Sequence, residues 1–311
     1  MANIKELKQT VKQVRRDIVR MVHANNSGHP GGSLGCAEFL VALYFETMKH
    51  DCSFNMNGKG EDLFFLSNGH ISPVFYSVLA RSGYFEVSEL STFRKINSRL
   101  QGHPTTHEGL PGVRMASGSL GQGMSVAIGA AETKKLNGDD RIVYSLHGDG
   151  ELQEGQIWEA AMYASAKKID NLICTVDLNG QQIDGSTDDV LNMGSLHAKF
   201  TAFGFDVIVE KAGNDMSKVV AAIEEAKNRT GKGMPVCILL HTEMGNGVDY
   251  MMGSHKWHGV APNDTELADA LAQNEETRRL LKVTSDEKIH LHRNKRYPIW
   301  LWRWSFRGSK K

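Results

Sequence analysis

The sequence predicts an α/β fold in which a parallel β-sheet is covered by helices on both faces. Two observations lead to this prediction: short, nearly continuous apolar runs recur along the chain, and segments with helical spacing of apolar residues lie between them. Strands that are apolar on both sides are typical of parallel sheets, because both faces of such sheets are buried. The chain has 311 residues, 41% of them hydrophobic, which is enough for two ordinary domains or one large one.

The predicted elements begin with an amphipathic helix over residues 4–22. Its apolar side chains recur at steps of three and four, and the polar stretch Asn25–Gly28 predicts its end. After a glycine-rich turn, a second helix is expected from about Cys36 to Met48. The predicted strands are Leu63–Leu66, Ile142–Leu146, Leu172–Val176, Phe205–Val209 and Val236–Leu240. The helical patterns between them cover Met124–Leu136, Ile157–Lys167 and Met216–Asn228.

Charge and cysteine content indicate the class of protein. The 36 Lys and Arg residues balance 36 Asp and Glu residues, so we expect a small-molecule enzyme rather than a protein whose main partner is nucleic acid or an anionic membrane. The four cysteines lie far apart and form no C-x-x-C pair, which predicts reduced thiols in a cytoplasmic protein. Charged residues near the start and the lack of an apolar run of about 18 residues predict neither a signal peptide nor a transmembrane segment.

The composition changes near Lys282, and a domain boundary is predicted there. Residues 1–282 form the predicted globular domain, whereas residues 283–311 carry eight Lys and Arg against two acidic residues. This basic tail also holds three of the five tryptophans, Trp300, Trp302 and Trp304. Three interpretations stay open for it: a simple basic appendage, a docking segment for a partner subunit or a membrane surface, and a reading-frame artefact.

The most informative motif follows the predicted strand Ile142–Leu146. There Asp149 stands between two glycines, which lets a ligand approach the carboxylate closely. The next strand ends in a segment that contains Asn179. If the two parallel strands are neighbours, both side chains converge at the edge of the sheet where ligands usually bind. Two oxygen ligands suit Mg²⁺ held together with a diphosphate, although a Gly-Asp-Gly sequence also occurs in ordinary turns.

A second glycine motif, Gly118-Ser-Leu-Gly-Gln-Gly123, opens the predicted helix Met124–Leu136. It resembles a dinucleotide-binding fingerprint only superficially, because no strand precedes it and its glycine spacing differs. Two interpretations stay open: its N–H groups hold a phosphate, or its glycines simply let the start of the helix pack closely.

Four histidines stand beside glycine or proline in turn-like segments, namely His29, His70, His103 and His258. A single loop histidine usually has a structural role, but four in similar settings suggest a common site. A zinc site is the competing interpretation, and it is disfavoured because no His-Glu-x-x-His motif or Cys/His cluster is present. Imidazoles here would serve as hydrogen-bond partners for phosphate, hydroxyl and developing alkoxide groups.

Together these motifs resemble the transketolase family. The following segments occur in the order typical of that family: Ser27-Gly-His-Pro-Gly-Gly, Ser67-Asn-Gly-His70, Gly102-His-Pro104, Gly118–Gly123, Gly148-Asp-Gly150 with Leu152-Gln-Glu-Gly155, Asp184-Gly185 and His258-Gly259. The resemblance extends from about residue 10 to about residue 270 and matches the first, diphosphate-binding domain. It implies the thiamine diphosphate-binding fold. It also implies transfer of a two-carbon ketol unit from a ketose phosphate to an aldose phosphate, as in the pentose phosphate pathway.

The resemblance also implies roles for individual residues. The Mg²⁺ ligands would be Asp149, Asn179 and the backbone carbonyl of Gln181, with Ca²⁺ or Mn²⁺ as substitutes. Contacts to the diphosphate are implied for Gly150, His70 and His258, and contacts to the pyrimidine and thiazolium region of the cofactor for Gly118 and Leu120. The substrate channel would be lined by His29, His103 and His258. Glu154 resembles a glutamate that lies buried at the family's subunit interface and helps to link two active sites.

Two departures from the family pattern matter. Many members have Asn-Asn where this chain has Leu178-Asn179, so the metal ligand is retained but its neighbour is changed. The family's second domain, which supplies the glutamate that activates the aminopyrimidine and the basic residues that recognise the sugar phosphate, is absent from this chain. The chain is therefore expected to be the N-terminal subunit of a split transketolase. It would need a separate C-terminal subunit, in a heterotetramer of two of each chain, and the tail at residues 283–311 has no counterpart in the family.

Two other functions stay open. One is another thiamine diphosphate enzyme, of the 2-oxoacid dehydrogenase or deoxyxylulose phosphate synthase type, although the histidine set favours transketolase. The other is a non-catalytic cofactor-binding module whose tail recruits partners.

Overall fold

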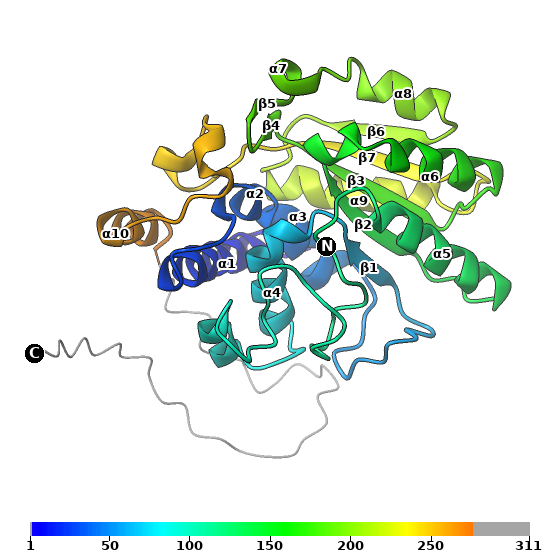
Figure 1. Cartoon of the computed structure of the whole chain (residues 1–311). Coiled ribbons are helices and arrows are strands. Elements are labelled where there is room, and N and C mark those ends of the chain that lie inside the picture. Colours follow the sequence, from blue (N-terminus) through cyan, green and yellow to red (C-terminus); the bar gives the residue numbers. More distant parts are fainter. Residues whose placement is uncertain (1, 276–311) are drawn as a thin grey trace, which may run out of the picture. The chain divides into compact units, whose positions relative to one another are not determined.

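The described part of the molecule is built on a five-stranded parallel sheet. The computed structural model describes residues 2–275 (Figure 1). The strands are β1 (Leu63–Leu66), β2 (Val143–Gly148), β3 (Leu172–Leu178), β6 (Asp206–Glu210) and β7 (Val236–His241), in the order β1-β2-β3-β7-β6 across the sheet. Every neighbouring pair is parallel. The predicted α/β fold is therefore confirmed, and each predicted strand agrees with an observed one to within two residues at either end.

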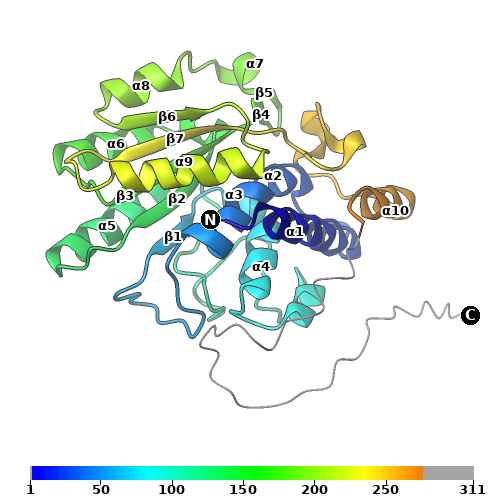
Figure 2. The ribbon, with the colours of Figure 1, turned by 180° about the vertical axis from the view of Figure 1, so that it is seen from behind.

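Side chains of the strands alternate between two apolar cores. On β1, Phe64 and Leu66 join one core, whereas Leu63 and Phe65 join the other. The first core is completed by helices α1 (Ile4–Ala24), α3 (Ala37–Ala42), α4 (Ser72–Arg81) and α9 (Met216–Arg229). The second is completed by α5 (Gly123–Leu136), α6 (Gly155–Ala166) and α8 (Leu196–Ala202). Figure 1 shows α5 and α6 in front of the sheet, and Figure 2 shows α9 and α1 in front when seen from behind. Burial of both faces explains why the strands are apolar on both sides.

Helix α1 ends where the polar stretch after residue 24 predicts. Its last residue is Ala24, and Asn26 then takes a positive φ of 47°. Buried polar contacts hold the helix in place: Arg16 donates hydrogen bonds to the carbonyls of Leu271 (2.8 Å) and Asn274 (2.9 Å), at the end of helix α10 (Asp264–Gln273). The two helices are thereby joined although they lie far apart in sequence.

The second predicted helix starts earlier than expected and is divided. Helix α2 spans Pro30–Gly35, α3 follows it, and a π-helical turn continues over Leu43–Thr47. The sequence predicts a turn at the glycines, but Gly31 packs so closely that an added Cβ would lie 2.7 Å from the carbonyl oxygen of Trp257. This approach between distant segments, which no local pattern reveals, places His29 at the start of α2.

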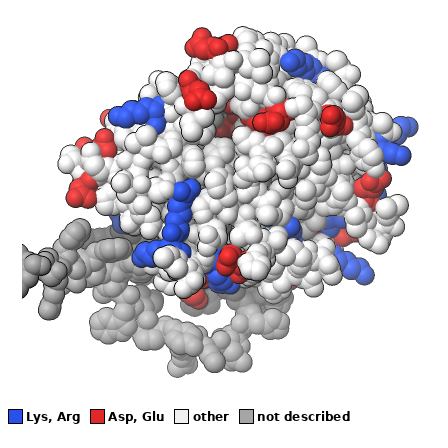
Figure 3. All heavy atoms as spheres, in the orientation of Figure 1, with Lys and Arg blue, Asp and Glu red and all other residues white. Residues whose placement is uncertain are grey.

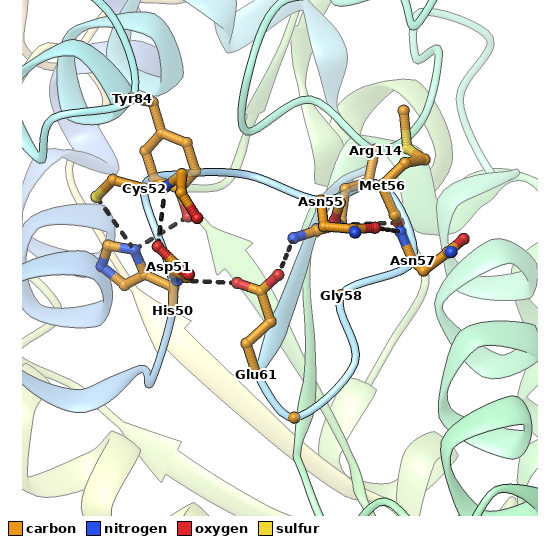
Figure 4. Close-up of polar contacts among 12 residues, drawn as sticks. His50, Asp51, Cys52, Asn55, Met56, Asn57, Gly58, Glu61, Tyr84 and Arg114 are labelled. Carbon is orange, nitrogen blue, oxygen red and sulfur yellow. Dashed lines mark hydrogen bonds and ion pairs between the residues drawn. The ribbon is translucent and has the colours of Figure 1, made fainter.

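Two long connections are tied together by Arg114 (Figure 4). Its guanidinium donates to Glu61 (2.6 Å) and to the carbonyl of Met56 (2.9 Å), and it lies 4.7 Å from the ring centroid of Phe54. Both charged side chains are largely buried, with 6% of Arg114 and 10% of Glu61 exposed. Arg114 precedes the Gly118 motif by four residues, so this tie holds the segment that leads into the motif.

Several elements are missed by the sequence prediction. Helix α4 is one of them, because residues 72–80 are all buried and so show no amphipathic stripe. The others are α8, α10 and the short elements β4 (Gln181–Gln182), β5 (Gly185–Ser186) and α7 (Thr187–Leu191). The predicted boundary near Lys282 and the tail at residues 283–311 lie outside the described residues. Across residues 2–275, no helix combines the length and apolar character needed to cross a membrane.

Candidate active site

Asp149 stands at the carboxyl end of strand β2, beside the end of β3. Gly148 of β2 pairs in register with Asp177 of β3, so the two strand ends are neighbours, as the parallel order predicts. The side chain of Asp149 is 1% exposed. Its Oδ1 accepts a hydrogen bond from the Gly150 N–H (2.8 Å), and its Oδ2 accepts one from the Gly180 N–H (2.6 Å). The loop after β3 is thereby folded onto the Asp149 carboxylate.

Asn179 is fixed within this same loop. Its Oδ1 accepts a hydrogen bond from the Gln181 N–H, and its Nδ2 donates to Oδ2 of Asp177, both at 2.9 Å. Gly180 makes the turn between them, with a φ of 72° that favours glycine. Gln181 then opens the hairpin of β4 and β5. The three predicted metal ligands, Asp149, Asn179 and Gln181, therefore lie along one edge of the sheet.

Asp177 orients Asn179 and was not singled out from the sequence. It is 2% exposed, it accepts hydrogen bonds from the Thr242 hydroxyl and the Asn179 amide, and the Cys36 thiol lies near it. Burial raises the pKa of Asp177, and these hydrogen bonds oppose the rise. Burial and the nearby charge of Asp177 also raise the pKa of Cys36 well above its usual value. Its position in the sequence could have indicated this role, because Asp177 and Asn179 stand two residues apart at the end of one strand.

The two carboxylates at this edge are buried without a basic partner. Within residues 2–275, no Lys or Arg forms an ion pair with Asp149 or Asp177. Burial, followed by the charge of Asp177, raises the pKa of Asp149 to about 7. A cation bound here would offset this unfavourable burial.

The donor atoms at this edge determine which metal would fit. Carboxylate, amide and carbonyl oxygens suit Mg²⁺ better than Zn²⁺, which prefers nitrogen and sulfur ligands. No three His, Cys, Asp or Glu side chains of the described part are grouped so that they could hold a metal by themselves. The residues present therefore fit an oxygen-coordinated cation that takes its remaining ligands from a bound anion.

The four predicted histidines form one cluster. The ring centroid of His29 lies 5.2 Å from that of His70, 6.1 Å from His103 and 5.5 Å from His258. The centroids of His70 and His258 are 5.0 Å apart. Burial, helped by the charges of His258 and Arg94, lowers the pKa of His29 to about 4. Burial also lowers the pKa values of the other three, so all four rings are neutral at pH 7 and can both donate and accept hydrogen bonds.

Gly118 borders this cluster, and Leu120 lies on the same loop. Gly118 has a φ of 148°, and an added Cβ would lie 3.3 Å from the ring of His103. Leu120 is partly exposed on the same loop. The loop ends at Gly123, where an added Cβ would lie 2.3 Å from Oγ of Ser67. Close packing therefore accounts for Gly123, whereas Gly118 and Leu120 remain open to a ligand.

Contacts between backbone segments join the histidines to the strand ends. An added Cβ on Gly148 would lie 3.9 Å from Asn68, so the segment that leads to His70 runs beside the tip of β2. The segment that carries His258 adjoins β4, and the charge of Asp184 opposes the lowering of the His258 pKa by burial. The acidic edge and the histidine cluster are thus parts of one site.

Arg94, which no sequence motif indicates, adds a positive charge beside this site. It lies outside the glycine and histidine motifs, so no local pattern indicated it. Its Nη1 donates to Oγ of Ser27 (2.6 Å), and its guanidinium lies 5.5 Å from the ring centroid of Phe93. A cavity of about 480 Å³ opens here, lined by Arg94, Gln101, Gly102, His103, Thr105 and Glu108.

A buried ion pair lies beneath the tip of β2. Nδ1 of His147 is 3.8 Å from Oε1 of Glu151, and both side chains are almost fully buried. Burial opposes the charge of His147, but the neighbouring Cys174 thiol and Glu151 carboxylate raise its pKa to about 9. Burial also opposes the charge of Glu151, but His147 lowers its pKa.

Glu154 occupies a different position from the other predicted residues. It is exposed in the single chain, immediately before helix α6, and no hydrogen bond or ion pair in residues 2–275 joins it to the strand ends. An added Cβ on Gly121 would lie 3.0 Å from the Cβ of Glu154, so Glu154 borders the Gly118–Gly123 loop from outside. A groove of about 450 Å³ lies between α5 and α6, lined by Ser125, Ile128, Gly129, Glu132, Gln156, Glu159, Ala160 and Tyr163.

Comparison with known sequences identifies relatives over most of the chain. Residues 6–279 match the family described as transketolase, thiamine diphosphate binding domain. One subunit of the apulose-4-phosphate transketolase of Actinobacillus succinogenes is 38% identical over 86% of this chain and 95% of its own length. The 6-deoxy-6-sulfo-D-fructose transketolase subunit SqwG of a Clostridium species is 36% identical over 87% and 96%. Human transketolase is 34% identical over 87% of this chain and 42% of its own length.

Solved structures show the same similarity. The transketolase from Campylobacter jejuni matches with a TM-score of 0.80 and 34% identity, over 88% of this chain and 43% of that chain. A mutant transketolase from Pichia stipitis matches with a TM-score of 0.80 and 30% identity, over 88% and 41%. The chain therefore spans less than half the length of these solved proteins.

Proposed function

Because this chain belongs to the transketolase family, we propose that it is the cofactor-binding N-terminal subunit of a two-chain transketolase. The reaction would move a two-carbon ketol unit from a ketose phosphate to an aldose phosphate. The observation that carries the proposal is that a buried acidic edge, which has no Lys or Arg partner within residues 2–275, adjoins four neutral histidines in one site. Relatives that are named as single subunits of transketolases, and that match over nearly their whole length, support the two-chain form.

The acidic edge would hold thiamine diphosphate through a divalent cation. In this proposal Asp149, Oδ1 of Asn179 and the carbonyl of Gln181 bind Mg²⁺, for which Ca²⁺ or Mn²⁺ would substitute. The diphosphate would contact Gly150, His70 and His258, while Gly118 and Leu120 would lie against the pyrimidine and thiazolium region. When bound, the cofactor supplies the carbon nucleophile and the electron sink for breaking the carbon–carbon bond.

The histidines His29, His103 and His258 would bind the sugar. A neutral imidazole donates a hydrogen bond from one ring nitrogen and accepts one at the other, so it can hold a substrate hydroxyl and pass a proton to a developing alkoxide. Nδ1 of His29 is buried and has no hydrogen-bond partner among the described residues, which supports its availability for a ligand. Their lowered pKa values keep these rings neutral at pH 7 without an added base.

A second chain would complete the enzyme by supplying the pyrimidine-binding and C-terminal domains. Exposed apolar side chains on the outer surface of this chain support such a contact: Val126, Met162, Tyr163, Ile183, Val190 and Leu191. Figure 3 shows the face in front of α5 and α6, where charged side chains are separated by broad uncharged areas. We place Glu154 at this subunit interface, in a heterotetramer with two copies of each chain. The four free cysteines support a cytoplasmic location.

Reconstitution tests the proposed function. The purified chain is mixed with a candidate second subunit, thiamine diphosphate and Mg²⁺, and supplied with ketose and aldose phosphates. Ketol transfer that needs both chains and stops when the metal is chelated is the expected result. Turnover of pyruvate in place of the ketose phosphate would instead indicate an enzyme of the 2-oxoacid dehydrogenase or deoxyxylulose phosphate synthase type. Cofactor binding without turnover of any substrate by any pairing would indicate a non-catalytic module.

A further inference from the structure

The carboxylate of Glu151 lies where three separate segments of the chain meet. It is 2% exposed and accepts a hydrogen bond from the hydroxyl of Ser67, just after β1. Oε1 also accepts from the Gly121 N–H (2.8 Å), just before α5, and Oε2 accepts from the Gly148 N–H (3.1 Å), at the end of β2. Nδ1 of His147 lies 3.8 Å from Oε1.

Each of these three segments leads directly into the proposed cofactor site. Ser67 precedes His70, Gly121 follows Leu120, and Gly148 precedes Asp149. Ser67 also links Gly123 to this junction. The Gly123 N–H donates to Oγ of Ser67 (3.1 Å), and the Ser67 hydroxyl in turn donates to Glu151. A displacement of the Glu151 carboxylate would therefore shift all three segments that lead into the site.

The chemistry of a carboxylate suits this junction. It only accepts hydrogen bonds, and the groups that surround Glu151 are donors. The isosteric amide of a Glu151→Gln variant keeps one acceptor oxygen, but its N–H₂ group would face at least one backbone donor and leave that N–H unsatisfied. The imidazole of His147 is itself oriented, with Nε2 2.9 Å from Oγ of Ser145.

We infer that Glu151 is a positioning residue that sets the three cofactor-binding segments in register before the cofactor arrives. The inference rests on the proposed function, because it assigns these segments to thiamine diphosphate and its metal. Preorganised segments bind a ligand more tightly, since less ordering remains to be done on binding. Glu151 itself touches neither Asp149 nor the four clustered histidines through a hydrogen bond in the described part, so its effect is exerted through the backbone.

The test compares Glu151→Gln with Asp17→Asn in the full chain assembled with its second subunit. Asp17 is a matched control: it is a buried carboxylate, 6% exposed, bonded to a serine, Ser77 (2.7 Å), and to a cation, Arg81 (2.5 Å), between α1 and α4. Calorimetry with thiamine diphosphate and Mg²⁺ should show an affinity lowered about tenfold to a hundredfold for Glu151→Gln. Asp17→Asn should lower the thermal midpoint but leave the affinity unchanged.

Hydrogen exchange of the cofactor-free protein provides the second measurement. In Glu151→Gln, amides of residues 67–70, 118–123 and 148–150 should exchange faster, whereas Asp17→Asn should leave these three segments as in the parent chain. If Glu151→Gln does not fold, Ser67→Ala removes one arm of the junction with a smaller change. It should weaken cofactor binding about threefold to tenfold and speed exchange near Gly123.

Two results separate failure of the inference from failure of the proposed function. A parent chain that binds no thiamine diphosphate would reject the proposed function, and with it the assignment of the three segments. A parent chain that binds the cofactor, together with Glu151 and Ser67 variants of equal affinity and unchanged exchange, would overturn the inference alone. A loss of affinity in Asp17→Asn as large as that in Glu151→Gln would also overturn it, because any buried carboxylate would then have the same effect.

Discussion

Asp149 is buried beside a second carboxylate, and each of its oxygens already accepts one backbone N–H. Replacing it in Asp149→Ala removes the charged ligand of the proposed metal site. Mg²⁺-dependent affinity for thiamine diphosphate should therefore fall about a hundredfold or more, measured by calorimetry on the assembled enzyme. Asp140→Ala, which removes a carboxylate that is 90% exposed, should keep the affinity of the parent protein. Equal affinities of the two variants would exclude Asp149 as a ligand.

His29 links the site to the pH dependence of stability. Burial lowers its pKa to about 4, so between about pH 6.5 and pH 4 the unfolded chain holds a proton on this ring that the folded chain lacks. The free energy of unfolding therefore falls as the pH falls through this window. For the full chain, His29→Asn should reduce the loss between pH 7 and pH 5 by on the order of 1 kcal/mol, measured by urea denaturation at both pH values.

The control for this prediction is His107→Gln, since His107 is an exposed histidine on the loop that follows the Gly102-His-Pro104 motif. The loss in the free energy of unfolding between pH 7 and pH 5 should be the same for His107→Gln as for the parent chain. A His29→Asn variant that loses as much stability between pH 7 and pH 5 as the parent would contradict the role given to burial of His29.

At the scale of elements, Arg114 joins the connection before β1 to the one that carries the Gly118 motif (Figure 4). Removing one partner of a buried ion pair leaves the other charge without compensation. Arg114→Ala should therefore lower the free energy of unfolding by about 3 kcal/mol in urea denaturation. Arg99→Ala breaks a comparable pair with Glu89, but the side chain of Arg99 is 40% exposed, so the loss should stay below about 1 kcal/mol. Similar losses of unfolding free energy in both variants would show that the buried Arg114 pair stabilises the fold no more than the exposed Arg99 pair.

Local patterns predicted the strands better than the helices of this protein. A buried parallel strand is apolar on both faces, so a run of only four to seven residues is enough to identify it. All five predicted strands are present in the structure. Helix α4 was missed because it is buried on every side, and α2 was predicted as a turn although its glycines serve packing rather than chain reversal. In both cases the determining contact is with a segment far away in sequence.

At the scale of the whole molecule, the groove between α5 and α6 is the surface on which assembly is predicted to depend. Gly129 lines this groove and has no atom within 4 Å of an added Cβ. Gly129→Arg should fill the groove and still favour the helix, because arginine has a higher helix propensity than glycine. Analytical ultracentrifugation with the second subunit should show loss of the complete assembly, while the thermal midpoint of the isolated chain stays equal or rises.

Ala221→Arg is the control for this variant, because Ala221 is an exposed small residue on α9, across the sheet from the groove. It should assemble normally. Full assembly of Gly129→Arg would remove the groove from the proposed interface.

The sequence by itself determined the fold class, the five strands and the transketolase family. Strand patterns are local, and motifs keep their order along the chain, so neither requires knowledge of distant contacts. The order of the glycine and histidine segments was specific enough that the family match over residues 6–279 confirms the resemblance. The roles of the individual site residues stay predictions.

Only the tertiary structure decided which side chains act together. It brought the rings of three histidines from separate segments to within about 6 Å of His29. It also joined Asp177 to Asn179 by a hydrogen bond and placed Arg94 and His103 in the lining of one cavity. Three segments donate hydrogen bonds to Glu151. The reason is physical: burial, pKa and hydrogen bonding depend on neighbours that packing brings from distant parts of the chain, and a linear pattern carries no record of those neighbours.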